Sequence, residues 1–226
     1  MKIYAFIFAR GGSKGLPKKN ILKINGLPLI AHSINTAKDL NEIDKVFVST
    51  DDDEIAKISS NFGAYIIKRP KELALDHSPE WLAWTHAIKW VYEKYGEFDI
   101  FLSLPATSPL RSINDVRKCL KKLTPDFDMV ITITPARRNP YFNMVNKDKF
   151  DEVQLVINNK KLVRRQDAPE VFDICTIAYV SRPNHIINSS CLWDGRVGAI
   201  KIDPRRSIDI DTKLDFEIAT LLMQNE

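Results

Sequence analysis

The segment Lys2-Ile-Tyr-Ala-Phe-Ile-Phe8 leads directly into Ala9-Arg-Gly-Gly-Ser-Lys-Gly-Leu-Pro-Lys-Lys-Asn20. The first part is an apolar run rich in β-forming residues, and it predicts a buried strand. The second part combines three glycines with four cations, so it offers backbone N–H groups and positive charge that suit a polyphosphate. Glycines at 11, 12 and 15 fit neither G-x-G-x-x-G nor G-x-x-x-x-G-K-[ST]. The alternative is a basic surface loop without a ligand.

Length and composition indicate a globular protein with one sizeable α/β domain. The chain has 226 residues, of which 44% are hydrophobic and 27% are charged, as is usual for globular proteins. The net charge of +4 is modest, so binding to nucleic acid is not expected. Arginines come in pairs at 137–138, 164–165 and 205–206. Paired guanidinium groups suit a small anionic ligand, with solvated surface charge as the alternative for each pair.

Cysteine content and hydropathy favour an intracellular location. The three cysteines, Cys119, Cys175 and Cys191, form no C-x-x-C motif and no even framework, which predicts reduced thiols in the cytoplasm. The N-terminal apolar run leads straight into the glycine loop, so we do not expect a separate signal peptide. No apolar stretch approaches the ~20 residues of a membrane helix. We therefore expect a cytoplasmic protein with no membrane contact.

Short apolar runs alternate with helical patterns along most of the chain. This alternation predicts a mostly parallel sheet with helices on both faces. The loops at 9–20, 50–53 and 104–111 would gather at the carboxyl ends of its strands, where such sheets bind ligands. The expected strands are 2–8, 46–50, 65–67, 99–104, 129–133, 174–181 and 197–202, and the expected helices are 54–62, 79–94, 114–123 and 212–224.

The pattern changes near residue 135. Short strand-like pieces at 153–157 and 162–163 predict an inserted β-rich segment within about 135–170. Neither an internal repeat nor a low-complexity linker separates this segment from the rest of the chain. We therefore predict a single domain over residues 1–226 with an insertion.

A second strong signal is Ser207-Ile-Asp-Ile-Asp-Thr-Lys-Leu-Asp-Phe216, in which Asp209 and Asp211 alternate with isoleucines. In an extended segment the two carboxylates project to one face, while Ile208 and Ile210 face the core. Two carboxylates beside a phosphate-binding loop suit Mg²⁺, which prefers carboxylates, water and substrate phosphates. The alternative is one metal ligand plus one charge that stabilises the following helix, for which Thr212 is the expected N-cap.

Two further loops carry polar side chains at the same expected sheet edge. Asp51 and Asp52 could bind ribose or a metal, or could supply negative charge to the first turn of a helix. The segment Thr107-Ser-Pro-Leu-Arg111 offers hydroxyls and a guanidinium, or turn chemistry at its proline. The sequence contains no G-x-S-x-G elbow and no candidate Cys–His pair, so a covalent nucleophile is not predicted.

Together these motifs resemble those of the CMP-sialic acid synthetases, the N-acylneuraminate cytidylyltransferase family. The resemblance covers nearly the whole chain and implies a three-layer α/β nucleotidyltransferase with a mostly parallel, Rossmann-like sheet. It also implies transfer of CMP from CTP to a 2-keto-3-deoxy sugar acid, in which the anomeric hydroxyl attacks the α-phosphorus in line and pyrophosphate leaves. The motifs are the 9–20 loop, Ser49-Thr-Asp-Asp52, Arg69-Pro-Lys-Glu-Leu-Ala-Leu-Asp76, Thr107-Ser-Pro-Leu-Arg111, Arg164-Arg-Gln-Asp167 and Asp209-Ile-Asp211.

The resemblance also implies roles for individual residues. The implied catalytic residues are Arg10, Lys14, Lys19 and Asp211, of which the three cations bind the triphosphate. Nucleotide contacts are implied for Arg10, Gly11, Gly12, Ser13, Lys14, Lys19, Asn20, Arg69 and Ser78. Acceptor contacts are implied for Thr107, Ser108, Arg111, Arg165 and Gln166, and Mg²⁺ ligation for Asp209 and Asp211. The family dimerises through a segment like 135–170, so a homodimer is implied. The group that removes the hydroxyl proton is left open between a metal-bound water and Asp211.

Two departures from the family pattern lie on the acceptor side. Many sialate enzymes have Gln-Pro before Thr-Ser-Pro-Leu-Arg, and that Gln reads the sugar, whereas this chain has Pro105-Ala106. Their Asn-Gly before an aliphatic-x-Tyr pattern is replaced here by Cys175-Thr176. The acceptor therefore stays open among N-acetylneuraminate, legionaminate, pseudaminate and related acids. The alternatives are another sugar nucleotidyltransferase, such as a CMP-3-deoxy-octulosonate synthetase, and a nucleotide-binding module without turnover.

Overall fold

The apolar run at the N-terminus forms β1 (Ile3–Phe8), an interior strand of a seven-stranded sheet. The computed structural model describes every residue except 159–161, 163, 225 and 226. The other strands are β2 (Lys23–Ile24), β3 (Leu27–Pro28), β4 (Lys45–Thr50), β5 (Tyr65–Lys68), β6 (Ile100–Ser103), β7 (Met129–Pro135), β8 (Val145–Lys147), β9 (Val153–Leu155), β10 (Phe172–Ser181) and β11 (Val197–Lys201).

The sheet is mostly parallel, as the alternating pattern predicts. Its strand order is β11–β7–β10–β6–β1–β4–β5. Every neighbouring pair is parallel except those made by β10, which runs antiparallel to both β6 and β7. Because β1 is covered on both faces, residues 3–7 are all buried, and this explains why its sequence is apolar without alternation.

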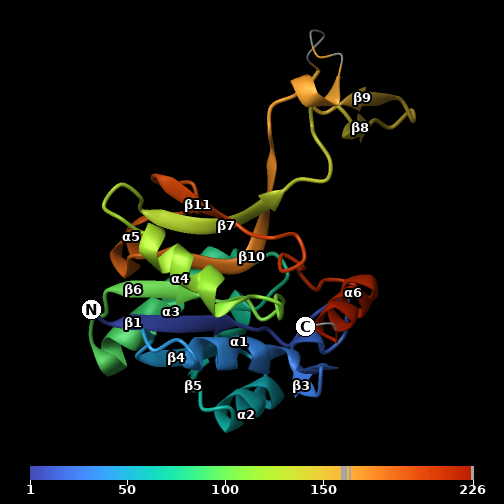
Figure 1. Cartoon of the computed structure of the whole chain (residues 1–226). Coiled ribbons are helices and arrows are strands. Elements are labelled where there is room, and N and C mark those ends of the chain that lie inside the picture. The colour runs from blue at the N-terminus through green and yellow to red at the C-terminus, as the bar shows by residue number, and fades with distance from the viewer. Residues whose placement is uncertain (159–161, 163, 225–226) are drawn as a thin grey trace.

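Helices cover both faces of the sheet (Figure 1). They are α1 (Leu29–Lys38), α2 (Asp53–Asn61), α3 (Glu80–Tyr95), α4 (Ile113–Lys122), α5 (Pro183–Asn188) and α6 (Lys213–Met223), with 3-10 turns η1 (Lys19–Ile21), η2 (Lys71–Leu73) and η3 (Arg165–Asp167). Ala5 and Ile7 of β1 pack toward α1, α2 and α4. Tyr4 and Phe6 pack toward α3 and α5. The result is the expected three-layer α/β architecture.

The C-terminal helix α6 lies beyond the carboxyl ends of the strands rather than on either face (Figure 1). Its buried Ala219 belongs to a small cluster with Ile24, Leu29 and Ile210. The predicted N-cap is confirmed, because the Thr212 side chain accepts from Asp215 N and the Asp215 side chain accepts from Thr212 N. This capping box fixes where α6 begins, and hence where the Asp209–Asp211 segment ends.

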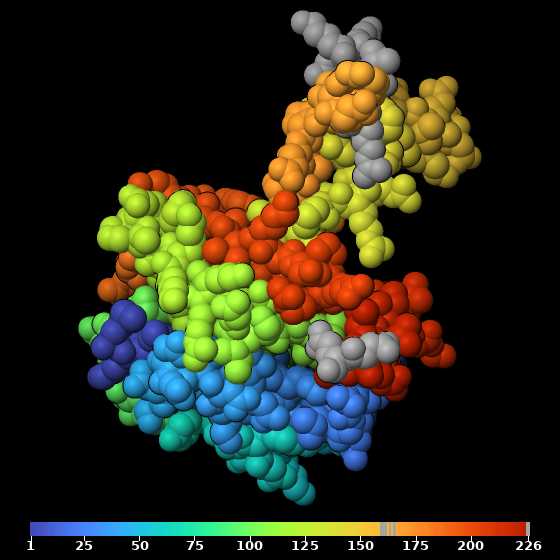
Figure 2. All heavy atoms as spheres, viewed as in Figure 1, coloured from blue at the N-terminus to red at the C-terminus, as the bar shows by residue number. Residues whose placement is uncertain are grey.

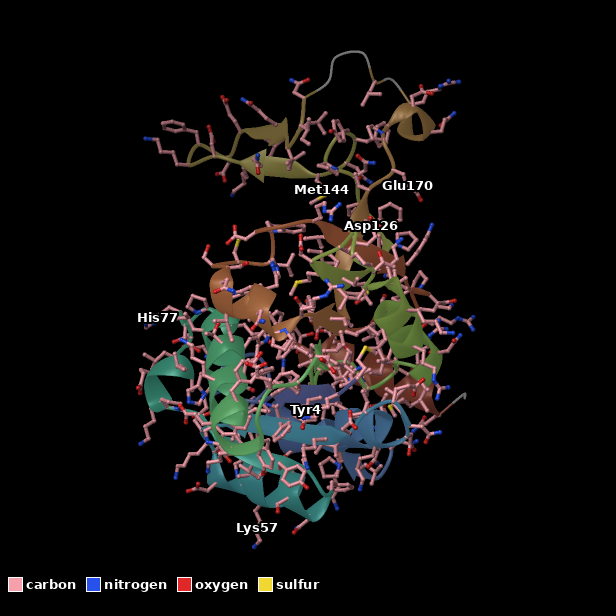
Figure 3. The ribbon with its side chains drawn as sticks, turned by 90° about the vertical axis from the view of Figure 1, so that its left-hand side faces the viewer. Tyr4, Lys57, His77, Asp126, Met144 and Glu170 are labelled. Atoms are coloured by element: carbon pink, nitrogen blue, oxygen red, sulfur yellow. The ribbon has the colours of Figure 1, made fainter. Side chains whose placement is uncertain are left out.

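The predicted insertion forms an arm that leaves the sheet after β7 and returns at β10. It carries the β8–β9 hairpin, in which Val145 pairs with Leu155. Figure 2 shows the arm as a lobe joined to the body by a narrow neck, and Figure 3 shows Met144 and Glu170 near that neck. The strand expected at 153–157 is β9. The piece expected at 162–163 falls partly outside the described residues, since residue 163 is not described, and residue 162 is not in a strand.

Helices α1 and α5 were not expected from the sequence, although α5 begins with a proline, Pro183, which is a usual helix-start signal. Helix α1 begins after Pro28, which makes no side-chain cap hydrogen bond, and its first turn has no acidic residue. Helix α5 has six residues, too few to show a 3.6-residue period. Within the described residues, no helix combines the length and the apolar character needed to span a bilayer.

Candidate active site

The glycine loop lies at the carboxyl end of β1, where neighbouring loops hold it. Gly11 N donates to Asp51 Oδ1 at 3.1 Å, and the buried Asn20 donates from Nδ2 to Arg10 O at 3.0 Å. Asp52 accepts from Ile55 N at 2.9 Å and so caps α2. Of the two alternatives for this acidic turn, the structure shows the helix cap for Asp52 and adds a loop anchor for Asp51.

The three predicted triphosphate cations line one cleft, but each is paired with a carboxylate. Lys19 Nζ lies 2.7 Å from Asp211 Oδ1, and Arg10 Nη1 lies 2.7 Å from Asp76 Oδ1. Lys14 also pairs with Asp76. The cleft has a volume of about 470 Å³ and is lined by Phe8, Arg10, Ser13, Lys14, Gly15, Lys19, Asn20, Thr107, Asp211 and Thr212. Positive charge therefore converges where the glycine loop predicts a phosphate site.

A second cavity of about 290 Å³ continues the cleft and shares Phe8 and Arg10 with it. Arg69 and Ser78, both predicted to lie near the nucleotide, line this cavity. The buried Arg69 donates from Nη2 to Ser49 O at 2.7 Å, and its guanidinium lies 5.6 Å from the Phe8 ring centre. Burial lowers the pKa of Arg69. The two cavities together form a groove in which Lys14 and Lys19 line one end, Arg69 and Ser78 line the other, and Phe8 and Arg10 lie between them.

The carboxylates Asp209 and Asp211 differ in their surroundings. Ile210 is buried and its N–H donates to Thr107 O at 2.9 Å, so the isoleucines face the core as predicted. However, residues 207–211 form no strand. The Asp211 side chain is 71% exposed, whereas Asp209 is partly buried, and burial, the largest influence, raises the pKa of Asp209. Hydrogen bonding from Thr107 and Thr176 and the charge of Lys19 oppose that rise.

The donor set at these carboxylates fits Mg²⁺. Asp209 Oδ1 is buried and has no hydrogen-bond partner among the described residues, and a buried acceptor of this kind carries a penalty unless something binds it. Within the same residues, no group of three His, Cys, Asp or Glu side chains could hold a metal alone. Two carboxylates that leave other positions to water and phosphate match the usual ligation of Mg²⁺.

Gly15 is required where the glycine loop meets this segment. A Cβ added at Gly15 would lie 2.5 Å from Asp211 O, whereas a Cβ at Gly12 would meet nothing within 4 Å. The loop and the carboxylate segment therefore touch through backbone at Gly15. The 3-10 turn η1 follows the loop and brings Lys19 to within hydrogen-bond distance of Asp211.

The predicted acceptor residues divide into two groups in the body of the protein. Thr107 lines the cleft, but Ser108 is fully buried and its Oγ lies 2.6 Å from Thr176 Oγ1. Arg111 is buried too, and it donates from Nε to Ile177 O at 2.9 Å and from Nη1 to Ser33 Oγ at 2.5 Å. Burial lowers the pKa of Arg111 to about 9, so it still carries its charge at neutral pH. Ser108 and Arg111 thus hold the 107–111 loop to β10 through hydrogen bonds, and neither lines the cleft.

Arg165 and Gln166 lie in η3, and Figure 1 shows this segment on the arm, away from the carboxyl end of β1 where the glycine loop begins. Gln166 is exposed. The structure of one chain therefore does not bring these two predicted acceptor residues to the remaining site.

Several cleft residues had no role assigned by the sequence argument. Asp76 closes the quoted Arg69–Asp76 motif, and that motif was the only signal that could have found it. Glu80 lines the Arg69 cavity and also a neighbouring pocket of about 270 Å³, with Trp84, Tyr179 and Leu192 among its lining residues. Burial raises the pKa of Tyr179. No sequence pattern distinguishes these aromatic residues from ordinary core residues.

Comparison with known proteins shows the family to which the chain belongs. A family model described as "Cytidylyltransferase" matches residues 4–173. The chain is 34% identical to the CMP-N,N'-diacetyllegionaminic acid synthase of Campylobacter jejuni, over 98% of this chain and 95% of that protein. It is 33% identical to the post-translational flagellin modification protein B of Campylobacter coli, over 100% of this chain and 96% of that protein.

More distant relatives extend the comparison. The chain is 30% identical to the N-acylneuraminate cytidylyltransferase B of Danio rerio, over 95% of this chain and 50% of that protein. A solved structure of CMP:2-keto-3-deoxy-manno-octonic acid synthetase complexed with CTP superposes with a TM-score of 0.73, covering 100% of this chain and 99% of that one. At 18% identity that likeness shows the fold alone. The chain belongs to the cytidylyltransferase family, and within it to the CMP-sialic acid synthetases that its sequence motifs resemble.

Proposed function

We propose that this protein transfers CMP from CTP to the anomeric hydroxyl of a sialic acid or a related nonulosonate, and releases pyrophosphate. The observation that carries the proposal is the cleft at the glycine loop, where Arg10, Lys14 and Lys19 converge beside Asp211. The named relatives act on acids of this class, by their own names. In the reaction a bond forms between the sugar oxygen and the α-phosphorus, and the bond to the pyrophosphate oxygen breaks.

The chain's own residues supply binding and charge rather than a covalent nucleophile. Arg10, Lys14 and Lys19 would hold the β- and γ-phosphates, and they would stabilise the charge that grows on pyrophosphate as it leaves. The N–H groups of Gly11 and Ser13 donate within the protein, to Asp51 Oδ1 and to Gly11 O. The backbone N–H of Gly12 would therefore be the one that helps to hold the chain of phosphates in line with the attacking hydroxyl. The cavity next to Arg69 has a volume of about 290 Å³ and is lined by apolar and polar side chains, among them Phe8, Leu73 and Ser78, and it would hold the nucleoside.

The two carboxylates would hold Mg²⁺. Asp209 contributes an oxygen that no described residue satisfies, and Asp211 contributes an exposed one next to Lys19. When bound, the ion supplies positive charge that neutralises the phosphate oxygens. The Lys19 side chain is only 12% exposed and lies beside Asp211, so its charge would lie between this carboxylate and the phosphates.

We further propose that the arm mediates a homodimer. Its hairpin exposes large apolar side chains, with Val145 at 56%, Phe150 at 73% and Val153 at 59% exposure, and apolar patches of this kind are typical of interfaces. A second copy of the chain would cover them. The same contact would carry Arg165 and Gln166 to the partner's cleft, where a guanidinium suits the sugar carboxylate.

A cytoplasmic location belongs to the same proposal. All three cysteines are free, and Cys119 and Cys175 are buried. Unpaired cysteines suit a reducing compartment, and CTP and sugar acids are substrates of intracellular synthesis.

The experiment that tests the activity is an acceptor panel scored by pyrophosphate release with CTP and Mg²⁺. N-acetylneuraminate, legionaminate, pseudaminate and 3-deoxy-octulosonate are supplied one at a time, and a reaction without acceptor gives the background. We expect release above background with at least one nine-carbon acid, and loss of that release in Asp211→Ala. CTP binding by calorimetry with no product from any acid would instead favour a nucleotide-binding module without turnover.

A further inference from the structure

Asp76 holds two of the cations that the proposed reaction needs for phosphate. One carboxylate oxygen lies 2.7 Å from Arg10 Nη1, and the other pairs with Lys14. Both cations come from the glycine loop, whereas Asp76 comes from the segment between β5 and α3. A single side-chain carboxylate therefore bridges the two cations, as a phosphate group would.

The Asp76 carboxylate has no other role in the described structure. Among the residues that the structure describes, it contacts no partner besides Arg10 and Lys14, and it caps no helix. The segment that carries it is held by other bonds. Leu73 N donates to Pro70 O at 3.0 Å, and Ser78 Oγ donates to Glu72 O at 2.6 Å. The segment's fold therefore does not depend on the carboxylate.

The contact is also easy to break. The Asp76 side chain is 43% exposed and the Lys14 side chain is 78% exposed, and ion pairs this open to water are weak. Figure 3 places the neighbouring His77 at the edge of the body, in contact with solvent. A multiply charged phosphate chain offers the same cations more negative charge than one carboxylate does, so it would compete with Asp76 for them.

We propose that Asp76 is an internal competitor for the phosphate chain: it occupies Arg10 and Lys14 in the free protein and, by returning to them after transfer, promotes release of pyrophosphate. This inference rests on the proposed function, because it needs a triphosphate substrate. Its consequence is that Asp76 weakens binding of every polyphosphate at this site. Removing its charge should therefore tighten binding, opposite to the effect of removing a group that contacts the ligand.

The test measures binding of inorganic pyrophosphate, with Mg²⁺, by calorimetry. Asp76→Asn should bind pyrophosphate about tenfold more tightly than the wild type, because two weak ion pairs no longer compete. Its turnover should also become more sensitive to inhibition by added pyrophosphate. Glu72→Gln is the matched control, since it removes one negative charge from the same segment without touching Arg10 or Lys14, and it should change the affinity less than twofold. Asp76→Glu keeps the negative charge, so it should bind pyrophosphate with the wild-type affinity.

The outcomes separate the two proposals. Equal or weaker pyrophosphate binding by a folded Asp76→Asn protein, with normal binding by the wild type, overturns the role of Asp76 and leaves the cytidylyltransferase proposal intact. An equal gain in Glu72→Gln also overturns it, because the effect would then be general electrostatics. A wild-type protein that binds neither CTP nor pyrophosphate would contradict the proposed function itself. Thermal unfolding of each variant confirms that it is folded.

Discussion

Most buried side chains in this protein stabilise the fold by packing, whereas a few destabilise it. Asp209 belongs to the second kind. Its Oδ1 is buried without a hydrogen-bond partner in the described part of the chain, and burial raises the pKa of its carboxyl. A carboxyl group whose surroundings disfavour its ionised form is a candidate for a functional residue. The function that we propose for Asp209 is to hold Mg²⁺.

Asp209→Asn should stabilise the metal-free protein at pH 7. The folded-state pKa of Asp209 is raised above its ordinary value of 3.8. The free energy of unfolding is therefore unaffected by Asp209 below that value, where the carboxyl is protonated in both states. It falls as the pH rises toward and through the higher folded-state pKa, because the buried carboxyl resists ionisation. Removing the charge should therefore raise the free energy of unfolding at pH 7, measured by urea unfolding with a chelator present, and the difference should shrink toward pH 4. A less stable variant at pH 7 would contradict the cost that we assign to Asp209.

Arg111→Ala should destabilise the fold without weakening CTP binding. Arg111 donates to Ile177 O and Ser33 Oγ from a buried position, so its removal leaves a cavity and unsatisfied acceptors worth about 3 kcal/mol. Arg117→Ala, which breaks an exposed pair with Glu42, is the control and should cost less than about 1 kcal/mol. If Arg111→Ala left the stability unchanged and raised the KM for the acceptor, Arg111 would be an acceptor-binding residue, as its motif implies.

The observed strands and helices agree with the predicted ones where the hydrophobic pattern extends over many residues. The strands expected at 46–50 and 129–133 and the helices expected at 79–94 and 114–123 correspond to β4, β7, α3 and α4. Loops at the carboxyl ends of β1, β4 and β6 gather as expected, because parallel strands end at one edge. Helix α1 escaped prediction because its first turn lacks the polar cap that usually announces a helix.

Gly15→Ala and Gly12→Ala test whether the glycine loop touches the carboxylate segment, because only position 15 lies against it. An alanine Cβ at 15 would meet Asp211 O at 2.5 Å, whereas one at 12 meets nothing. We expect Gly15→Ala to cost about 1–3 kcal/mol in unfolding free energy, and to reduce turnover because Asp211 shifts. Gly12→Ala should be nearly as stable as the wild type in the absence of CTP. Equal stabilities for the two variants would show that the segments do not touch.

The candidate site was predictable only in part, for reasons visible at particular residues. The glycines and cations of the 9–20 loop are recognisable because phosphate binding needs backbone N–H groups and charge from a short stretch. Arg111 and Ser108 are not distinguishable in sequence from ligand-binding residues, since their partners come from β10 and α1. Asp76 and Glu80 lie far along the chain from the loop, and they meet Arg10 only in the folded protein, at the cavity that all three line.

The molecule as a whole consists of a packed three-layer body and an arm joined to it by a narrow neck (Figures 1 and 2), where Glu170 of the arm pairs with Lys201 of β11. Val153→Asp should leave the body folded and convert a dimer into a monomer, because Val153 is already 59% exposed in one chain. Leu214→Asp on α6, at 64% exposure, is the matched control and should stay dimeric. Light scattering in solution measures the mass of each protein. A monomeric wild type would contradict the arm-mediated dimer.

The most direct measurement of the central claim is nucleotide selectivity in the full reaction. CTP, UTP and GTP are each supplied at equal concentration, with Mg²⁺ and an accepted sugar acid, and the sugar nucleotide and the pyrophosphate are quantified together. We predict that CTP alone gives both products in equal amounts, and that the product is a CMP-sugar. A sugar nucleotide formed from UTP or GTP but not from CTP would contradict the cytidylyltransferase assignment.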